Sequence, residues 1–415
     1  RVKKLDPTLH SFLLVTEERA MADAQAAEAR MMAGSRKGPL DGIPIAHKDI
    51  YNTAGIRTTG HSKLLQNNVP TEDSVVVQKW AEAGTVMLGK LATHEFAIGG
   101  PSFDLPWPPA RNPWNPDHCT AGSSSGTGAA VAAGLIMGGT GSDTGGSIRI
   151  PSSLCGLTGF KPTARRIPTE GAWPLSRTLD SVGPLAPTVA CCAMLDAALA
   201  GVAIDVPDAL PIAGLRLAVP QTLVLDGIED GVARTFEAAL SRLAAAGARI
   251  VDIPFPTLGE IPKVNARGGI YAEAWAVHRH QIAASRDRYD PRVASRILRV
   301  QNMNAADYID VLVARERLMA EADAITAPFD AVVLPATAMT APAIAPLEAD
   351  EDLYIRTNIL ILRNTFCFNF LDRCALSIPM QRAGDGPCGL MVVGETMGDR
   401  RLLSVGRAIE RALAG

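Results

Sequence analysis

The sequence predicts an α/β fold: a single large domain in which a mixed central β-sheet is sandwiched between helical layers. Helical and extended patterns alternate, as in the helix and strand of residues 74–88 and the strand–helix–strand unit of residues 215–254. The chain contains no internal repeat with a period of 20–50 residues and no linker of disordered composition. We therefore expect one domain over residues 1–415, with 203–345 as an embedded subdomain.

Capping residues and glycines mark the first elements. A helix is expected at 16–32, with Thr16 as its N-cap and Gly34 as its stop. A turn and a short strand at 39–46 then lead to Lys48. A lysine is usually exposed, but the apolar residues on both sides predict that Lys48 is enclosed, where desolvation disfavours its charged form.

The next stretch combines regular elements with a long loop. We expect a helix at 74–83, capped near Thr71 and ended by Gly84, and a strand at 85–88. Residues 98–122 hold six prolines and two tryptophans, which predicts a loop, and such long loops are often functional. The remaining expected elements are a loop-rich segment at 163–188, a helix to about 201, the unit 215–254, mainly helices at 257–330, strands at 331–335, 375–379 and 389–393, and a helix at 399–413.

Composition and charge exclude several classes of protein. A hydrophobic content of 47% and a charged content of 20% are typical of a globular chain. The net charge of −3 argues against a nucleic-acid partner. The seven cysteines contain no CxxC pair, so we expect neither a disulfide framework nor a zinc site, and we expect the reducing cytoplasm as the compartment.

One uncharged stretch invites comparison with a membrane span. Residues 119–142 contain no Asp, Glu, Lys or Arg over 24 positions, but their apolar run at 129–137 is only about nine residues long. A transmembrane helix needs about 20 apolar residues. A buried helix is therefore expected here, with no membrane association, and no secretory signal pattern precedes it.

Two clusters of glycine and serine flank this apolar run. The first, GSSSG at 122–126, contains Ser123, and the second, DTGGS at 143–147, ends in Ser147, 24 positions later. Glycines beside the serines leave backbone N–H groups unobstructed, which suits a site that stabilises an oxyanion. The stretch contains no histidine that could act as a base.

Together with PIAHKD at 44–49, these clusters and their spacing resemble the amidase signature family of serine hydrolases. The similarity extends from about Asp6 to the C-terminus and implies the amidase signature fold. The chain opens at Arg1, inside what resembles the end of a helix of the family. We therefore expect that an N-terminal segment of the family is absent from this numbering.

The resemblance assigns roles to individual residues. It implies Lys48 as the base, Ser123 as a hydroxyl relay after a cis peptide bond from Gly122, and Ser147 as the acylated nucleophile. It also implies Thr144, Gly145 and Gly146 as the oxyanion hole, Asp143 and Arg149 as supports of that loop, and Ile98, Gly99 and Gly100 as part of the substrate pocket. For Asp143 and Arg149, an ordinary surface ion pair is the other interpretation.

Lys48 can act as a base only when it is neutral. At the reference pKa of about 10.4, only about one lysine in 2,500 is neutral at pH 7. Lowering the pKa by roughly three units costs about 4 kcal/mol and leaves a sizeable neutral fraction, and burial is the available means. The proton would then pass from Ser147 through Ser123 to Lys48, and back through Ser123 to the leaving amine.

GSSSG at 122–126 also matches the G-x-S-x-G elbow of α/β-hydrolases, with Ser124 as the nucleophile. That elbow needs a strand directly before it, and residues 112–121, with two prolines, are expected not to form one. Its base would be His278 or His280, in a helical segment. A metal site at these two histidines is also disfavoured, because residues i and i+2 diverge on a helix.

Two further interpretations keep the fold and change the role. The glutaminase subunit of a tRNA-dependent amidotransferase resembles this chain, but PTARRIPTEGAW at 162–173 lacks the tyrosine–glycine features that we associate with that branch. A non-enzymatic interaction protein is disfavoured because Lys48, Ser123 and Ser147 are all present.

The sequence therefore predicts an amidase that hydrolyses the C–N bond of small or aryl linear amides. Carbamates, including urethanes, and esters undergo the same attack, and these motifs do not separate them. An apolar or aromatic group on the substrate is indicated by the loop residues Ile98, Trp107, Trp173 and Leu175. We expect no cofactor, no metal, no nucleic acid and a small-molecule amide or carbamate as the partner, and the sequence is compatible with a homo-oligomer.

Overall fold

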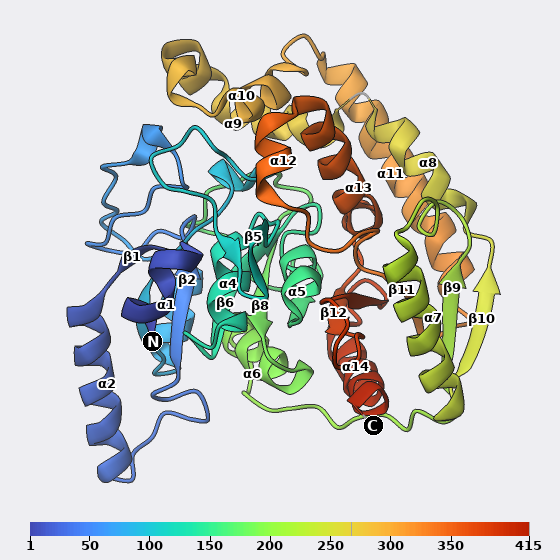
Figure 1. The fold of residues 1–415 in the computed structure, drawn as a ribbon, viewed down its shortest axis with the longest axis horizontal. Helices are drawn as coiled ribbons and strands as arrows, with labels where there is room; N and C mark the ends of the chain where they lie inside the picture. Colours follow the sequence, from blue (N-terminus) through green and yellow to red (C-terminus); the bar gives the residue numbers. More distant parts are fainter. Residues whose placement is uncertain (267, 415) are drawn as a thin grey trace.

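The computed structural model describes residues 1–266 and 268–414 as one domain around an 11-stranded sheet (Figure 1). The strands are β1 (Phe12–Val15), β2 (Pro44–Lys48), β3 (Val86–Leu91), β6 (Gly138–Asp143), β7 (Thr158–Lys161), β8 (Ser181–Ala186), β9 (Arg216–Pro220), β10 (Arg249–Ile253), β11 (Ala331–Pro335), β12 (Ala375–Pro379) and β13 (Gly389–Val393). Their order is β1-β3-β2-β6-β8-β7-β12-β13-β11-β9-β10. β2 is parallel to β3 and β6, whereas β8 and β12 are antiparallel to both neighbours, so the predicted mixed sheet is confirmed.

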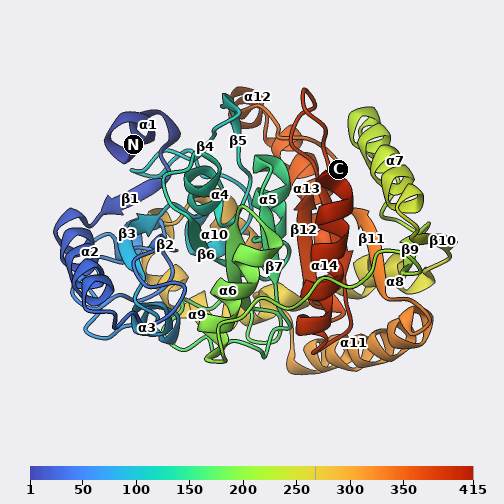
Figure 2. The same cartoon turned by 90° about the horizontal axis from the view of Figure 1, so that it is seen from below.

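Helices cover both faces of the sheet, which confirms the predicted layers. On one face, α3 (Val75–Glu82), α6 (Val189–Ala200), α7 (Asp230–Ala245) and α14 (Asp399–Ala414) pack on the sheet, and Figure 2 shows α6 beside α14. The other helices are α1 (Val2–Leu9), α2 (Glu17–Met32), α4 (Ser125–Ala132), α5 (Arg149–Cys155), α8 (Pro256–Asn265), α9 (Gly269–Ser285), α10 (Pro291–Leu298), α11 (Ala305–Thr326), α12 (Ile344–Ala349) and α13 (Glu351–Phe370). Of these, α4 and α5 cover the opposite face at the centre of the sheet. The helices α8 to α11 confirm the mainly helical stretch at 257–330, of which residue 267 lies outside the described residues, as does residue 415 at the end of the predicted domain.

Hydrophobic burial explains why the two helical layers form. The larger core cluster joins Trp80 of α3 and Leu199 of α6 to sheet residues such as Leu376, and all three are essentially inaccessible to solvent. A second cluster joins Leu258 of α8 and Phe368 of α13 to the opposite face. Each fully buried side chain of this size contributes about 1.5–3 kcal/mol. The segment 203–345 supplies β9, β10 and β11 to the common sheet, and its limits as a subdomain stay a prediction.

The central strand β6 has the sequence GGTGSD and was not predicted, because it lacks the apolar residues that usually indicate a strand. It lies between α4 and α6, which approach its backbone closely. A Cβ atom on Gly139 would lie 2.6 Å from Thr127 of α4, and one on Gly138 would lie 2.5 Å from Leu195 of α6. The glycines therefore serve close packing. The buried helix expected over 129–137 is wrong in its second half, because α4 ends at Ala132.

Other local expectations also need correction. The N-cap of α3 is Ser74 rather than Thr71, since the Ser74 hydroxyl accepts a hydrogen bond from Val77 N. The loop-rich segment 163–188 contains β8, whose six residues are all buried. Residues 112–121 do form a strand, β5 (Asn115–Cys119), which pairs with β4 (Arg111–Asn112) as a separate two-stranded ribbon. Pro116 is tolerated because the ribbon has free edges.

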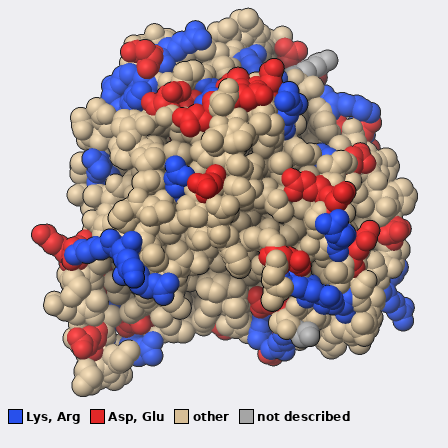
Figure 3. All heavy atoms as spheres, viewed as in Figure 1, with Lys and Arg blue, Asp and Glu red and all other residues tan. Residues whose placement is uncertain are grey.

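Lysine, arginine and acidic side chains are interspersed on the face shown in Figure 3. None of the helices within residues 1–266 and 268–414 is long and apolar enough to cross a membrane.

Candidate active site

The candidate site lies where two neighbouring strands end. β2 and β6 run parallel, so their carboxyl ends, Lys48 and Ser142-Asp143, meet at one edge of the sheet. The backbone N–H of Lys48 donates to Thr140 Oγ1 over 2.9 Å, and its Nζ donates to Ser142 Oγ over 2.8 Å. Because alternate residues of a strand share a face, Thr140 and Ser142 both present hydroxyls to Lys48.

The amine of Lys48 is completely buried, as its apolar neighbours predicted. Nζ donates a second hydrogen bond to Ser123 Oγ over 2.7 Å. Burial lowers the pKa of Lys48 to about 7, although the negative charges of Asp143 and Asp180 raise it. About half of the amine is then neutral at pH 7, which is the form that can accept a proton.

The two serine clusters adjoin each other at this point. A cis peptide bond joins Gly122 to Ser123, as expected. Ser147 precedes α5, and its carbonyl oxygen accepts a hydrogen bond from Ser124 N over 3.3 Å. Among the described residues no hydrogen bond joins the hydroxyls of Ser123 and Ser147. Such contacts often tighten only when substrate binds, so this step of the relay stays a prediction.

The loop from Thr144 to Ser147 presents backbone donors. In the described part of the chain, nothing accepts a hydrogen bond from the backbone N–H of Gly145, Gly146 or Ser147. Gly146 has a φ of 135°, and a Cβ atom there would lie 2.1 Å from Thr365 Oγ1, so this position requires glycine. Thr365 Oγ1 in turn donates to the Gly145 carbonyl over 2.7 Å. The loop is thus held in a shape that leaves its N–H groups for a ligand.

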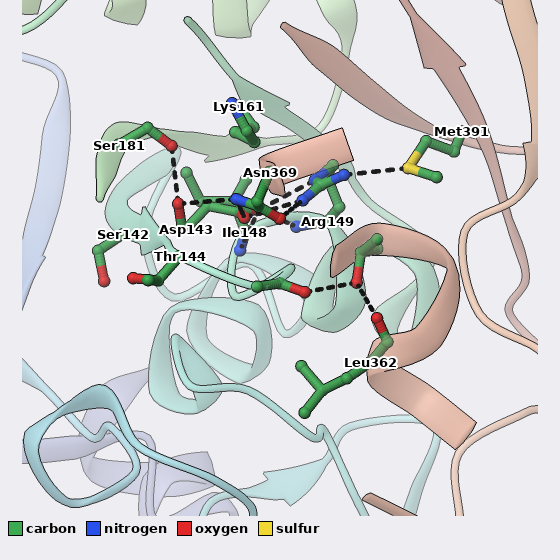
Figure 4. Close-up of polar contacts among 12 residues, drawn as sticks. Ser142, Asp143, Thr144, Ile148, Arg149, Lys161, Ser181, Leu362, Asn369 and Met391 are labelled. Atoms are coloured by element: carbon green, nitrogen blue, oxygen red, sulfur yellow. Dashed lines mark hydrogen bonds and ion pairs between the residues drawn. The ribbon is translucent and has the colours of Figure 1, made fainter. Parts of the chain in front are cut away.

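A buried polar network supports this loop from behind (Figure 4). Asp143 and Arg149 form an ion pair over 2.9 Å with both side chains fully buried, so the pair is not a surface ion pair. Arg149 also donates to Asn369 Oδ1, and Asn369 Nδ2 donates to Asp143 Oδ1 over 2.8 Å. Burial alone would raise the pKa of Asp143, but the charge and hydrogen bonds of Arg149 outweigh it and lower that pKa to about 2.

A cavity of about 390 Å³ opens beside the loop. Its lining includes the polar residues Ser142 and Thr144 and the apolar residues Trp173 and Leu175. The ring of Trp173 packs at 4.9 Å from that of Phe96, measured between centroids. Polar and apolar groups line this cavity in about equal measure, and its volume lies within the range of sites for small molecules.

The other residues predicted for the substrate pocket lie elsewhere. Gly99 and Gly100 line a much smaller cavity of about 20 Å³ that also touches Gly122. Ile98 is buried in a hydrophobic cluster. Of the residues predicted to meet the substrate, the structure therefore brings Trp173 and Leu175 to the larger cavity.

Three residues at the site were not predicted from the sequence. Ser142 contacts Lys48, Asp180 accepts a hydrogen bond from Thr144, and Asn369 completes the network around Asp143. The only signal for Ser142 was its place beside Asp143, because the strand that turns its hydroxyl towards Lys48 has no apolar pattern. Asn369 had none, since it comes from the end of α13, 226 positions after Asp143.

The arrangement around Ser124 does not match a hydrolase elbow. β5 belongs to the separate ribbon and not to the central sheet. The Ser124 hydroxyl accepts a hydrogen bond from Ser142 N over 3.4 Å, and the ring of His278 contacts Tyr289 instead. His280 contacts Arg279. Within residues 1–266 and 268–414, no group of three His, Cys, Asp or Glu side chains could hold a metal ion.

Ser142→Ala should lower kcat by about fivefold, because one hydrogen bond to the Lys48 amine is worth about 1 kcal/mol. The measurement is steady-state hydrolysis at pH 7 and pH 9. Ser153→Ala is the matched control, since Ser153 is equally buried but contacts Thr337 and Gly389. A Ser142→Ala variant with the kcat of the unaltered protein would show that the contact has no role in turnover.

Comparisons with known proteins cover nearly the whole chain. The family model described as Amidase matches residues 1–403. The A subunit of the glutamyl-tRNA(Gln) amidotransferase of Geobacter metallireducens is 33% identical, over 100% of this chain and 92% of the relative. A crystal structure of an amidase matches with a TM-score of 0.88 and 29% identity, over 99% of this chain and 93% of that chain. The corresponding A subunit of Thermotoga maritima matches with a TM-score of 0.78 and 30% identity, over 99% and 89%.

Proposed function

The chain belongs to the amidase signature family, and on this premise we propose that it hydrolyses the C–N bond of linear amides through an acyl-enzyme on Ser147. Lys48 is the base, Ser123 relays the proton, and Ser147 is the nucleophile. The observation that carries the proposal is the fully buried Lys48 amine, 2.7 Å from Ser123 Oγ. Among the described residues no carboxylate forms an ion pair with Lys48, and burial without such a pair favours the neutral amine that a serine nucleophile needs as its base.

The reaction runs in two halves. Neutral Lys48 accepts the Ser123 proton while Ser123 accepts that of Ser147, whose oxygen then attacks the amide carbonyl. The backbone N–H groups of Thr144, Gly145 and Gly146, together with that of Ser147, stabilise the oxyanion. The C–N bond breaks as the proton returns through Ser123 to the leaving nitrogen. Water, activated by the same relay, then attacks the acyl-enzyme and releases the acid and free Ser147.

We propose a small or aryl amide as the first candidate substrate. Its support is the cavity of about 390 Å³ beside Thr144, with the indole of Trp173 on its wall. Carbamates and esters of similar shape fit the same attack and belong in the same substrate panel. The cytoplasmic location and a homo-oligomeric state stay predictions.

The second candidate is the glutaminase role, in which glutamine is the amide and ammonia passes to a partner. The curated relatives favour this candidate over the first, since the Geobacter metallireducens protein matched along the whole chain is the A subunit of an amidotransferase. The segment PTARRIPTEGAW at 162–173, without the tyrosine–glycine features of that branch, favours the first candidate. Under either candidate the proposed bond cleavage is the same.

A substrate panel tests the proposal and separates the candidates. The purified chain is incubated with butyramide, an anilide, a phenyl carbamate, an ester and L-glutamine, and the released amine or ammonia is measured. Mass spectrometry then locates the acyl adduct, with Ser147→Ala as the control. An adduct on Ser147 from a simple amide supports the first candidate. Ammonia from glutamine alone, and only with added partner subunits, would establish the second, and no adduct on Ser147 from any substrate would refute the mechanism.

Trp173→Ala should lower kcat/KM for anilides by about tenfold or more and leave that for butyramide nearly unchanged. The reason is that the indole forms the apolar wall of the cavity, and burying an aromatic ring against it is worth about 1–3 kcal/mol. Trp114→Ala is the control, because Trp114 is 61% exposed and does not line this cavity. Equal losses for the two substrates would mean that Trp173 has only a structural role.

A further inference from the structure

Asp180 lies immediately before β8, between the wall of the cavity and the oxyanion loop. Its Oδ1 accepts a hydrogen bond from Thr144 Oγ1 over 2.5 Å, and its Oδ2 accepts one from Leu175 N over 2.9 Å. The next residue, Ser181, donates to the carbonyl oxygen of Asp143 over 2.8 Å. Asp180 and Ser181 therefore hold Thr144, the first residue of the oxyanion loop, and the residue before it in place.

The cavity wall on the other side of Asp180 is itself attached to α9. Thr178 donates to the carboxylate of Glu273 twice, from its backbone N–H over 3.0 Å and from its hydroxyl over 2.6 Å. The indole N–H of Trp173 points at His278 Nε2 over 3.5 Å. Glu273 and His278 both belong to α9 (Gly269–Ser285). The wall segment 173–178 is thus tied to the helical layer at two places, and Asp180 is its connection to the oxyanion loop.

We propose that Asp180 is a positioning residue that couples the substrate wall at Trp173–Leu175 to the oxyanion loop at Thr144. A substrate that packs against Trp173 then presses on a segment whose shape sets the direction of the N–H donors. The inference rests on the proposed function for the meaning of the loop, whereas the mechanical link rests on the two hydrogen bonds alone. Asp180 acts through Thr144 and Leu175, not on the reacting atoms.

The carboxylate must be ionised to accept both hydrogen bonds. Burial raises the pKa of Asp180 to about 6, against the hydrogen bonds from Thr144 and Leu175, and the charge of Glu273 raises it too. The negative charges of Asp143 and Asp180 both raise the pKa of Lys48. Arg177 and Glu170 line the same cavity nearer its exposed rim. Removal of the Asp180 charge therefore lowers the pKa of Lys48.

The kinetic test compares Asp180→Asn with Thr144→Val, Thr144→Ser and the double variant, and uses Asp205→Asn, an exposed carboxylate, as the control. We expect Asp180→Asn and Thr144→Val each to lower kcat roughly 10- to 100-fold with KM within about threefold, as for misplaced oxyanion donors. Thr144→Ser should recover most of the loss, and the double variant should be no worse than the single ones. Only Asp180→Asn should move the acid limb of the pH profile to lower pH.

A second measurement needs no turnover. Hydrogen–deuterium exchange without substrate should rise in residues 173–176 and 148–150 together in Asp180→Asn, but only in 148–150 in Thr144→Val, because the N–H groups of Ile148 and Ile150 are hydrogen-bonded to Asp143 and to Gly146 of the loop. If exchange at 148–150 is unchanged in Asp180→Asn, or if the kinetic losses of the two variants multiply in full, the proposed link is wrong. If the unaltered protein cleaves no amide but Asp180→Asn still shows the paired rise in exchange, the proposed function is refuted and the link between the two segments stands.

Discussion

Lys48→Met should remove most turnover and leave the protein at least as stable as before. The loss of the base should lower kcat roughly 10²–10⁴-fold, because proton transfer from Ser123 then has no acceptor. Methionine keeps a similar volume in a site where the lysine side chain is inaccessible to solvent. The measurements are steady-state kinetics on an amide and chemical unfolding of both proteins.

The stability of the protein with Lys48 should also depend on pH in a defined direction. The pKa of Lys48 is lowered from 10.5 to about 7 in the folded state. Between about pH 7 and 10.5 the unfolded chain therefore binds one more proton than the folded one, so stability rises with pH in this window. At pH 7 the cost to folding is about 4 kcal/mol. The difference in unfolding free energy between Lys48→Met and the unaltered protein should accordingly shrink as the pH is raised from 7 to 10.

The same pKa sets the pH dependence of catalysis. Activity should rise with pH through about 7, because only the neutral amine accepts a proton. Lys263→Met is a suitable control for both readouts, since the Lys263 side chain is 74% exposed. A Lys48→Met variant that retains near-normal kcat, or an activity profile that is flat from pH 6 to 9, would contradict the assignment of Lys48 as the base.

The elements that could be predicted from the sequence are those with a local pattern of apolar residues and turn residues. The strands β11, β12 and β13 were predicted with their observed bounds, because apolar and β-branched runs end there at turn residues. The strand β6 was missed for the opposite reason: its glycines are required by the close approach of α4 and α6, a tertiary constraint without a local pattern. The helix α13 was also not predicted.

The candidate site likewise contains residues that local motifs reveal and residues that only the tertiary structure reveals. The clusters that contain Lys48, Ser123 and Ser147 are local motifs, and the buried contact between Lys48 and Ser123 spans only 75 positions. The groups that hold the oxyanion loop in place come from distant segments, such as Thr365, 220 positions after Gly145. A threonine or asparagine near the end of a helix has no sequence feature that reveals such a partner. The candidate catalytic residues and the local support from Asp143 and Arg149 could therefore be predicted from the sequence, but the support from distant segments could not.

Arg149→Met should destabilise the protein by about 3–5 kcal/mol, the usual effect of removing one partner of a buried ion pair. Both side chains of the Asp143–Arg149 pair are fully buried, so the variant leaves Asp143 charged without a counter-ion or forces it to take up a proton. Arg400→Met should cost about 1 kcal/mol or less, because the Arg400–Asp205 pair is 64% and 51% exposed. Urea unfolding of the two variants compares the two sites directly.

The pH dependence and a double variant separate charge from packing. The pKa of Asp143 is lowered from 3.8 to about 2 in the folded state. Its ionised carboxylate therefore stabilises the folded protein above about pH 4, and this stabilisation is lost as the pH falls from about 4 to about 2. Arg149→Met should remove that dependence. Asp143→Asn/Arg149→Met should then be less destabilised than Arg149→Met alone, since the double variant leaves neither charge of this pair without its partner. If the double variant is instead as unstable as the sum of the single ones, the network holds the loop by shape and hydrogen bonds, and the charges of Asp143 and Arg149 are not what supports Ser147.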